Sequence, residues 1–153
     1  MDLTKLHQVL HWASEGKTKE LEDLFNQSLQ LKSIGATVDL SNLKRPLVEL
    51  KMVEPMHQGG IGGSAVNGGI ISMLSDFAIG LLGVPYYNEG LTATQHLSIH
   101  FVKPLMAVSV RLEAEETQVI HNRVFGQVKV MNENGDVCAF ATGTLAKGIK
   151  KAI

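Results

Sequence analysis

The chain has 153 residues, of which 44% are hydrophobic, and its formal net charge is −1 at pH 7. This length supports one domain with a substantial core and is too short for us to expect two. The basic residues are scattered along the chain, so the charge pattern favours neither a nucleic-acid partner nor an anionic membrane surface. We therefore expect a protein that acts on a small molecule.

The cellular compartment is indicated by what the sequence lacks. Cys138 is the single cysteine, which excludes an internal disulfide and fits a reducing environment. The first 25 residues alternate charged and apolar side chains and have no apolar stretch typical of a signal peptide. The longest apolar run, residues 68–84, is interrupted by two serines and an aspartate and is marginal in length for a bilayer span. We expect a soluble, cytoplasmic protein.

The N-terminal part of the chain has the spacing of amphipathic helices. Apolar residues between Leu3 and Leu31 recur at steps of three and four. The tripeptide Ser-Glu-Gly at residues 14–16 separates two predicted helices. We expect residues 1–153 to form a single domain, with residues 1–33 as a helical extension and residues 46–148 as the core.

The strands are predicted on both sides of a central helix. Residues 46–54 (PLVELKMVE) alternate between two faces and begin with a proline, which suits the first position of a strand. Four further β-like stretches lie at 91–102, 107–120, 124–131 and 137–146. Asn134-Gly135 is the preferred dipeptide for a tight hairpin turn between the last two. No helical pattern separates these four stretches, so we expect them to form an antiparallel meander.

The predicted central helix spans residues 68–82. On a helical wheel of about 100° per residue, one broad arc collects Ile70, Ile71, Leu74, Phe77, Ala78, Leu81 and Leu82. Asp76 lies opposite the centre of that arc and is the only charged residue between His57 and Glu89. A surface helix would carry lysines and glutamates on that face. We therefore predict a helix buried all round, by a curled sheet on one side and by a second subunit on the other.

A buried carboxylate is costly unless it is paired, neutralised or used, which makes Asp76 a functional candidate. The alternative is that Asp76 caps a neighbouring loop or is less buried than the wheel suggests. Asn67 is a good N-cap, and Gly68 and Gly69 leave backbone N–H groups open to a ligand. Such groups at the positive end of a helix can stabilise an oxyanion. Asp76 is about 12 Å from Gly68 along the helix, so a substrate that reaches both needs curvature or a partner chain.

Three stretches carry a family resemblance: AVNGGIISMLSDFAIG, TATQHLSIHFVKP and GDVCAFATGTLAKG. Between Leu47 and Lys147 the chain resembles the acyl-CoA thioesterases of the hotdog fold, in the PaaI-like branch of that superfamily. The resemblance implies an α+β fold in which a five-stranded antiparallel sheet wraps around a central helix, with the N-terminal helices as an addition. It also implies a homodimer whose sheets join edge to edge and whose active sites lie at the interface. A dimer of dimers is the larger assembly left open.

Residue roles follow from this resemblance. Asp76 corresponds to a carboxylate that acts as nucleophile or as general base toward water. Gly68, with Gly69, would polarise the thioester carbonyl through backbone N–H groups, beside Asn67. Thr94 matches a hydroxyl that orients the acid or the water. The substrate-binding candidates are His57, Gln58, Ser64, Ser72 and Lys103.

Two positions depart from the family pattern. Asn67 stands where the family commonly has histidine, and Ile61 stands where asparagine or glutamine is common. If that earlier side chain positions water, its role is vacant here or falls to His57, Gln58 or Ser64. A noncatalytic acyl-CoA or acyl-carrier binding protein is therefore the alternative to an enzyme. A hotdog dehydratase would need a histidine paired with an acid, which the central region does not present convincingly.

The expected activity is hydrolysis of an acyl-CoA thioester, with no metal and no cofactor beyond the coenzyme A of the substrate, because a thioester is already activated. His7 and His11 share a predicted helix but supply only two of the ligands that a metal site needs. Residues 60–65 fit the dinucleotide pattern G-x-G-x-x-A, but the alternating strands and helices of that fold are missing. We expect the N-terminal helices to cover part of the acyl pocket.

Overall fold

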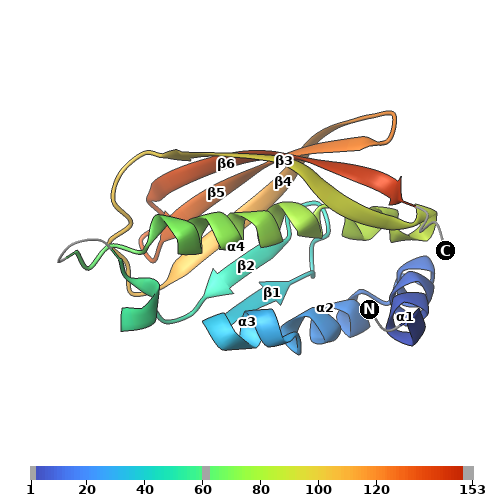
Figure 1. Ribbon diagram of the computed structural model, residues 1–153, viewed down its shortest axis with the longest axis horizontal. Helices are drawn as coiled ribbons and strands as arrows, with labels where there is room; N and C mark the ends of the chain where they lie inside the picture. Colours follow the sequence, from blue (N-terminus) through green and yellow to red (C-terminus); the bar gives the residue numbers. More distant parts are fainter. Residues whose placement is uncertain (1–2, 60–62, 150–153) are drawn as a thin grey trace.

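A computed structural model describes residues 3–59 and 63–149 of the chain (Figure 1). Its α-helices are α1 (Leu3–Ser14), α2 (Thr18–Asn26), α3 (Leu29–Ile34) and α4 (Gly68–Leu81), and its 3₁₀ helices are η1 (Pro55–His57) and η2 (Val84–Glu89). Its strands are β1 (Ala36–Asp39), β2 (Leu47–Leu50), β3 (Leu91–Phe101), β4 (Val110–Ile120), β5 (Arg123–Asn132) and β6 (Val137–Ile149). None of the helices in the described part is long and apolar enough to span a membrane.

The strands form one antiparallel sheet in the order β1-β2-β4-β5-β6-β3. Strands β4, β5 and β6 form the expected meander, and the Asn134-Gly135 turn is confirmed: Gly135 has φ +81°, and its N–H donates to the Asn132 carbonyl at 3.0 Å. The meander prediction is wrong for β3. This strand crosses to the far side of the sheet and pairs with β6, so that Phe101 lies opposite Ala139.

The sheet has six strands instead of the expected five, because the sequence reading missed β1. This strand pairs with β2, with Val38 opposite Val48. The first predicted strand, residues 46–54, shortens to β2. The N-terminal region holds three helices instead of two, because the chain turns at Ser28, whose hydroxyl accepts the Leu31 N–H at 3.4 Å and caps α3. Gly35, in the left-handed conformation, ends α3.

The sheet curves around α4, which runs along its concave face (Figure 1). Two glycines opposite each other on β5 and β6 allow this close approach. A Cβ built on Gly143 would lie 2.9 Å from the Cγ atoms of Ile79, and one built on Gly126 would overlap the Leu82 side chain. The buried face of α4 consists of Ile71, Leu74, Ser75, Ala78, Ile79 and Leu81.

Within one chain the sheet buries one side of the central helix, as predicted, and the side expected to face a second subunit is exposed. Met73 is 39% exposed and Asp76 is also exposed, because the sheet covers only one side of α4. Leu21, Leu31 and Ile34 of the N-terminal helices are buried in the same core as the sheet and α4. The helical extension is therefore part of the packed domain.

Strand β3 forms a long edge of the sheet. It pairs with β6 on one side only, and none of its eleven residues is fully buried. The other side of β3 leaves a row of backbone N–H and C=O groups without a neighbouring strand. Such an edge is suited to pairing with another chain.

Candidate active site

Asp76 and Thr94 line the same cavity, which has a volume of about 260 Å³. Asp76 comes from the exposed face of α4 and Thr94 from β3. The α2–α3 segment closes the cavity with Phe25 and Leu31. Asp76 and Thr94, two of the predicted catalytic residues, therefore come from different elements and lie at the same cavity.

Helix α4 and strand β3 run in opposite directions (Figure 1). At the start of the helix, a Cβ built on Gly68 would lie 3.3 Å from Cζ of Phe101, the last residue of β3. At its other end, a Cβ on Gly83 would overlap Thr92, near the beginning of β3. Each end of the helix is therefore fixed against the opposite end of the strand, and the Asp76 cavity lies between them.

Asn67 is the N-cap of α4, as predicted from its position. Its Oδ1 accepts the Gly69 N–H at 2.7 Å. This bond occupies one of the two N–H groups that the sequence offered as oxyanion donors. In the described part of the chain the Gly68 N–H donates to no acceptor, so Gly68 is the better donor of the pair. Ser72 steadies this turn, because its hydroxyl donates to the Gly68 carbonyl at 2.7 Å.

The helix start and the Asp76 cavity are separate places in one chain. Gly68 and Asp76 are eight residues apart on a continuous helix, which is about 12 Å. None of Asn67, Gly68 and Gly69 lines the cavity that holds Asp76 and Thr94. Within one chain, the predicted oxyanion donor and the predicted carboxylate are therefore too far apart to act on the same thioester group.

His57 is a structural residue. Its side chain is 1% exposed, and its Nδ1 accepts the Glu54 N–H at 2.9 Å. Nε2 therefore carries the proton and donates to the Ile34 carbonyl at 2.9 Å. Both ring nitrogens are used within the chain, which leaves none for the substrate contact that the sequence suggested.

The other substrate-binding candidates lie outside the Asp76 cavity. Gln58 forms a β-bridge with Val66, directly before the helix start. The Ser64 hydroxyl is 3.9 Å from the Met106 sulfur, and the exposed Lys103 amine is 3.5 Å from the Asp136 carboxylate. The position of the Ile61 departure and most of the glycine pattern at 60–65 lie outside the described residues.

Sequence reasoning missed the far end of the cavity. Tyr87 and Thr92 line it together. Burial raises the pKa of the Tyr87 phenol. No sequence pattern links these two residues to Asp76, since their proximity depends on how η2 returns to β3.

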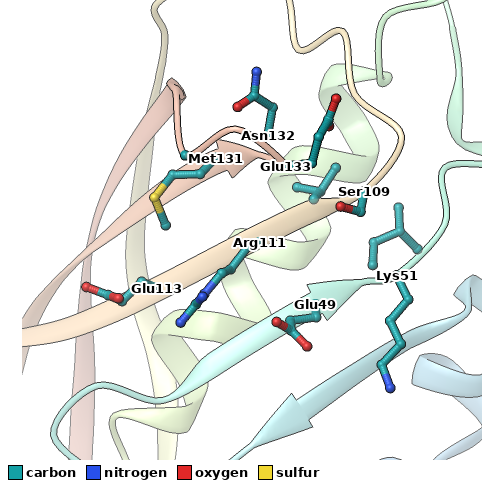
Figure 2. Close-up of a pocket in the computed structure, with 11 residues that line it drawn as sticks. Glu49, Lys51, Ser109, Arg111, Glu113, Met131, Asn132 and Glu133 are labelled. Atoms are coloured by element: carbon teal, nitrogen blue, oxygen red, sulfur yellow. The ribbon is translucent and has the colours of Figure 1, made fainter.

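A second hollow, of about 460 Å³, lies on the outer face of the sheet, and Figure 2 shows its lining. Glu49, Arg111 and Met131 face it from β2, β4 and β5, where they occupy one row of paired positions. Charges of both signs line it, including Lys51 and Glu133. It shares no residue with the predicted site, so we place the chemistry at the Asp76 cavity.

Among residues 3–59 and 63–149, no three His, Cys, Asp or Glu side chains are grouped so that they could hold a metal ion. Cys138 is buried, and this burial raises the pKa of its thiol. A thiol of that kind is a poor nucleophile.

A curved antiparallel sheet that curls around one long helix is the arrangement of the hotdog fold. Solved structures share it. The Escherichia coli PaaI protein from the phenylacetic acid degradation operon is similar over 91% of this chain and 95% of its own, with a TM-score of 0.72 and 14% identity. A Haemophilus influenzae thioesterase matches 88% of this chain and 94% of its own, with a TM-score of 0.76 and 13% identity.

A PaaI protein from Thermus thermophilus, in a mutant form, matches 78% of this chain and 99% of its own, with a TM-score of 0.67 and 21% identity. No protein-family model matches the sequence, and no curated protein matches it either. The similarity is therefore one of fold. It confirms the hotdog architecture expected from the sequence, with neighbours that are PaaI-like and thioesterase-superfamily proteins.

Proposed function

We propose that this protein is an acyl-CoA thioesterase in which Asp76 delivers the attack on the thioester. The observation that carries the proposal is the shared cavity of Asp76 and Thr94 beside the central helix of a thioesterase-like hotdog fold. The cavity is lined by apolar side chains together with these polar groups, as a site for an acyl group requires.

In the reaction, Asp76 as general base takes a proton from a water molecule, and the water oxygen bonds to the thioester carbon. The carbonyl oxygen becomes an oxyanion, which accepts the Gly68 N–H. The C–S bond then breaks, the coenzyme A thiolate leaves, and the proton held by Asp76 neutralises a product. In the alternative route the Asp76 oxygen itself bonds to the carbon, and water then hydrolyses the resulting anhydride. Thr94 orients the carboxylate or the water in either route.

One thioester can contact a Gly68 N–H and an Asp76 carboxylate together only if a second copy of the chain supplies one of them, because about 12 Å separates the two residues along one helix. The free edge of β3 is the surface through which we propose that two copies pair in antiparallel fashion. Gly68 and Asp76 are each four residues from Ser72. A two-fold axis near Ser72 would therefore set Gly68 of one copy opposite Asp76 of the other, giving two composite sites per dimer.

The test is the release of free coenzyme A thiol from a panel of acyl-CoAs. We expect Asp76→Asn to lower turnover by at least about 100-fold, the usual scale for loss of a general base. A matched control is Asp23→Asn, which removes an exposed carboxylate of α2 that pairs with the exposed Lys19. It should leave turnover unchanged. Equal turnover of wild type and Asp76→Asn would refute the role of Asp76.

A noncatalytic acyl-CoA or acyl-carrier binding protein is the second candidate. It is favoured by Asn67, which takes the place of the family histidine and uses its side chain to occupy the Gly69 N–H. This candidate predicts that non-hydrolysable S-alkyl-CoA thioethers bind while no acyl-CoA releases thiol. Calorimetry with the thioethers, run beside the thiol assay, separates the two candidates.

A further inference from the structure

Gly80 is the penultimate residue of α4, one turn beyond Asp76, and lines the same cavity. A Cβ built on Gly80 would meet no atom within 4 Å. This sets Gly80 apart from Gly143, where a Cβ would lie 2.9 Å from Ile79. The missing side chain of Gly143 makes room for the helix, whereas the missing side chain of Gly80 leaves open space.

A glycine in a helix costs stability relative to alanine, by up to about 1 kcal/mol in a helix interior. Gly80 does not have the left-handed backbone that would require a glycine. Within the described part of the chain no packing contact requires it either, since nothing lies where its Cβ would be. The space beside Gly80 is therefore available to a ligand.

The cavity extends away from Asp76 in the direction of Gly80. Along α4 the step from Asp76 to Gly80 is about 6 Å. Along β3 the step from Thr94 to Thr92 is about 7 Å. Because the helix and the strand are antiparallel, both steps lead toward the same end, where Tyr87 lies.

The N-terminal helices supply a further part of the lining. Phe25 of α2 and Leu31 of α3 line the cavity, and the buried Leu31 anchors this part to the core. Gly80 and Phe25 therefore both border the space beside Asp76. The cavity volume of about 260 Å³ is below the roughly 300–1,000 Å³ usual for ligand pockets, so the cavity limits the length of the group that it accepts.

We propose that Gly80 is a specificity-determining residue: the acyl chain runs from the thioester at Asp76 past Gly80 and Phe25 toward Tyr87. The substrate class is then an acyl group of medium length. This inference rests on the proposed acyl-CoA site. It adds that Gly80 determines the length of the acyl group that the site accepts.

The test uses Gly80→Ala, Gly80→Leu and Phe25→Ala with acetyl-, hexanoyl- and decanoyl-CoA. Gly80→Leu fills the space and should lower kcat/KM for the six- and ten-carbon substrates by at least about 10-fold, the scale of a misfit of one or two carbons. It should lower kcat/KM for acetyl-CoA by a smaller factor, so that the preference for hexanoyl-CoA over acetyl-CoA falls. Gly80→Ala should have a smaller effect of the same kind. Phe25→Ala should improve decanoyl-CoA relative to hexanoyl-CoA.

The matched control for Phe25→Ala is Leu29→Ala, which removes an apolar side chain of the same region that is 82% exposed and lies outside the cavity. It should leave the chain-length profile unchanged. Thermal melting checks the fold, and Gly80→Ala should melt at or above the wild-type temperature. An unchanged profile in Gly80→Leu, or an equal loss on all three substrates, would overturn the assignment.

Binding of S-ethyl-, S-hexyl- and S-decyl-CoA thioethers distinguishes this inference from the proposed hydrolysis. Thioethers that bind without any thiol release from acyl-CoAs would refute the hydrolase. Loss of S-hexyl-CoA binding in Gly80→Leu, with S-ethyl-CoA binding kept, would still support the acyl chain passing Gly80. If the wild type binds no thioether and releases no thiol, both proposals fail.

Discussion

Asp76 and Thr94 face one cavity from two elements, a helix and the edge strand of the sheet. The helix is held over the sheet by its buried face, and β3 is held by β6. Neither side chain depends on a mobile connection for its position. The structure thus supplies two polar groups at a defined place, and their joint effect can be measured.

The hydroxyl of Thr94 should matter for turnover. We expect Thr94→Val, which keeps the shape and removes the hydroxyl, to lower kcat by about 10- to 100-fold with little change in KM. Thr94→Ser should recover most of the rate. Thr142→Val on β6 is the control, because Thr142 is exposed and outside the cavity. Full activity of Thr94→Val would show that Thr94 only lines the wall.

His57 should contribute to stability. His57→Leu would leave the Glu54 N–H and the Ile34 carbonyl without their partner, so we expect the free energy of unfolding to fall by about 2–4 kcal/mol. Urea denaturation measures this loss. His7→Leu, at an exposed position of α1, should cost far less. A midpoint for His57→Leu equal to that of wild type would contradict the structural role.

Gly143 should not tolerate a side chain. A Cβ at 2.9 Å from Ile79 forces the helix or the strand to move, and we expect Gly143→Ala to cost about 1–3 kcal/mol. The double variant Gly143→Ala/Ile79→Ala should lose less unfolding free energy than the sum of the two single variants, because the smaller side chain at position 79 makes room for the added Cβ. Thermal or urea unfolding of the three variants gives the coupling. Strict additivity would show that the contact is not limiting.

The two tyrosines should make the protein sensitive to alkali. Burial, with the hydrogen bond to Glu116, raises the pKa of Tyr86 to about 12, and burial also raises the pKa of Tyr87. The folded state then holds protons that the unfolded state releases above pH 10, so stability should fall as pH rises from 10 to about 12. Absorbance at 295 nm should show no tyrosinate step at pH 10 before unfolding. A full step at pH 10 in the folded protein would contradict this.

The sequence predicted the central helix well because its signals are local. Asn67 as N-cap and the apolar arc around Leu74 depend on neighbours in the chain. The prediction from sequence failed where the structure depends on pairing between segments that are distant in the chain. The strand at Ala36–Asp39 is too short to show a pattern, and its pairing with β2 defines it. The position of β3 beside β6, at the edge, follows from how the sheet closes around α4.

The candidate site was predictable in part for the same reason. Asp76 stands out as a lone charge in an apolar segment, and the resemblance supplied Thr94. The wall formed by Phe25 and the far end at Tyr87 depend on how remote elements pack, which no local pattern encodes. His57 looked like a polar ligand, because one sequence does not show that Glu54 and Ile34 satisfy its ring.

The central claim, that Gly68 of one copy and Asp76 of another serve one thioester, is tested by complementation. Gly68→Pro removes the N–H at the first helical position, where proline is favourable, and Asn67 already has the extended conformation that precedes proline. Asp76→Asn removes the base.

Each variant alone should be inactive in thiol release. When the two variants are unfolded, mixed and refolded together, about half of the dimers should be heterodimers, each with one intact site. The mixture should therefore recover about a quarter of wild-type activity. No recovery in verified heterodimers would contradict the account.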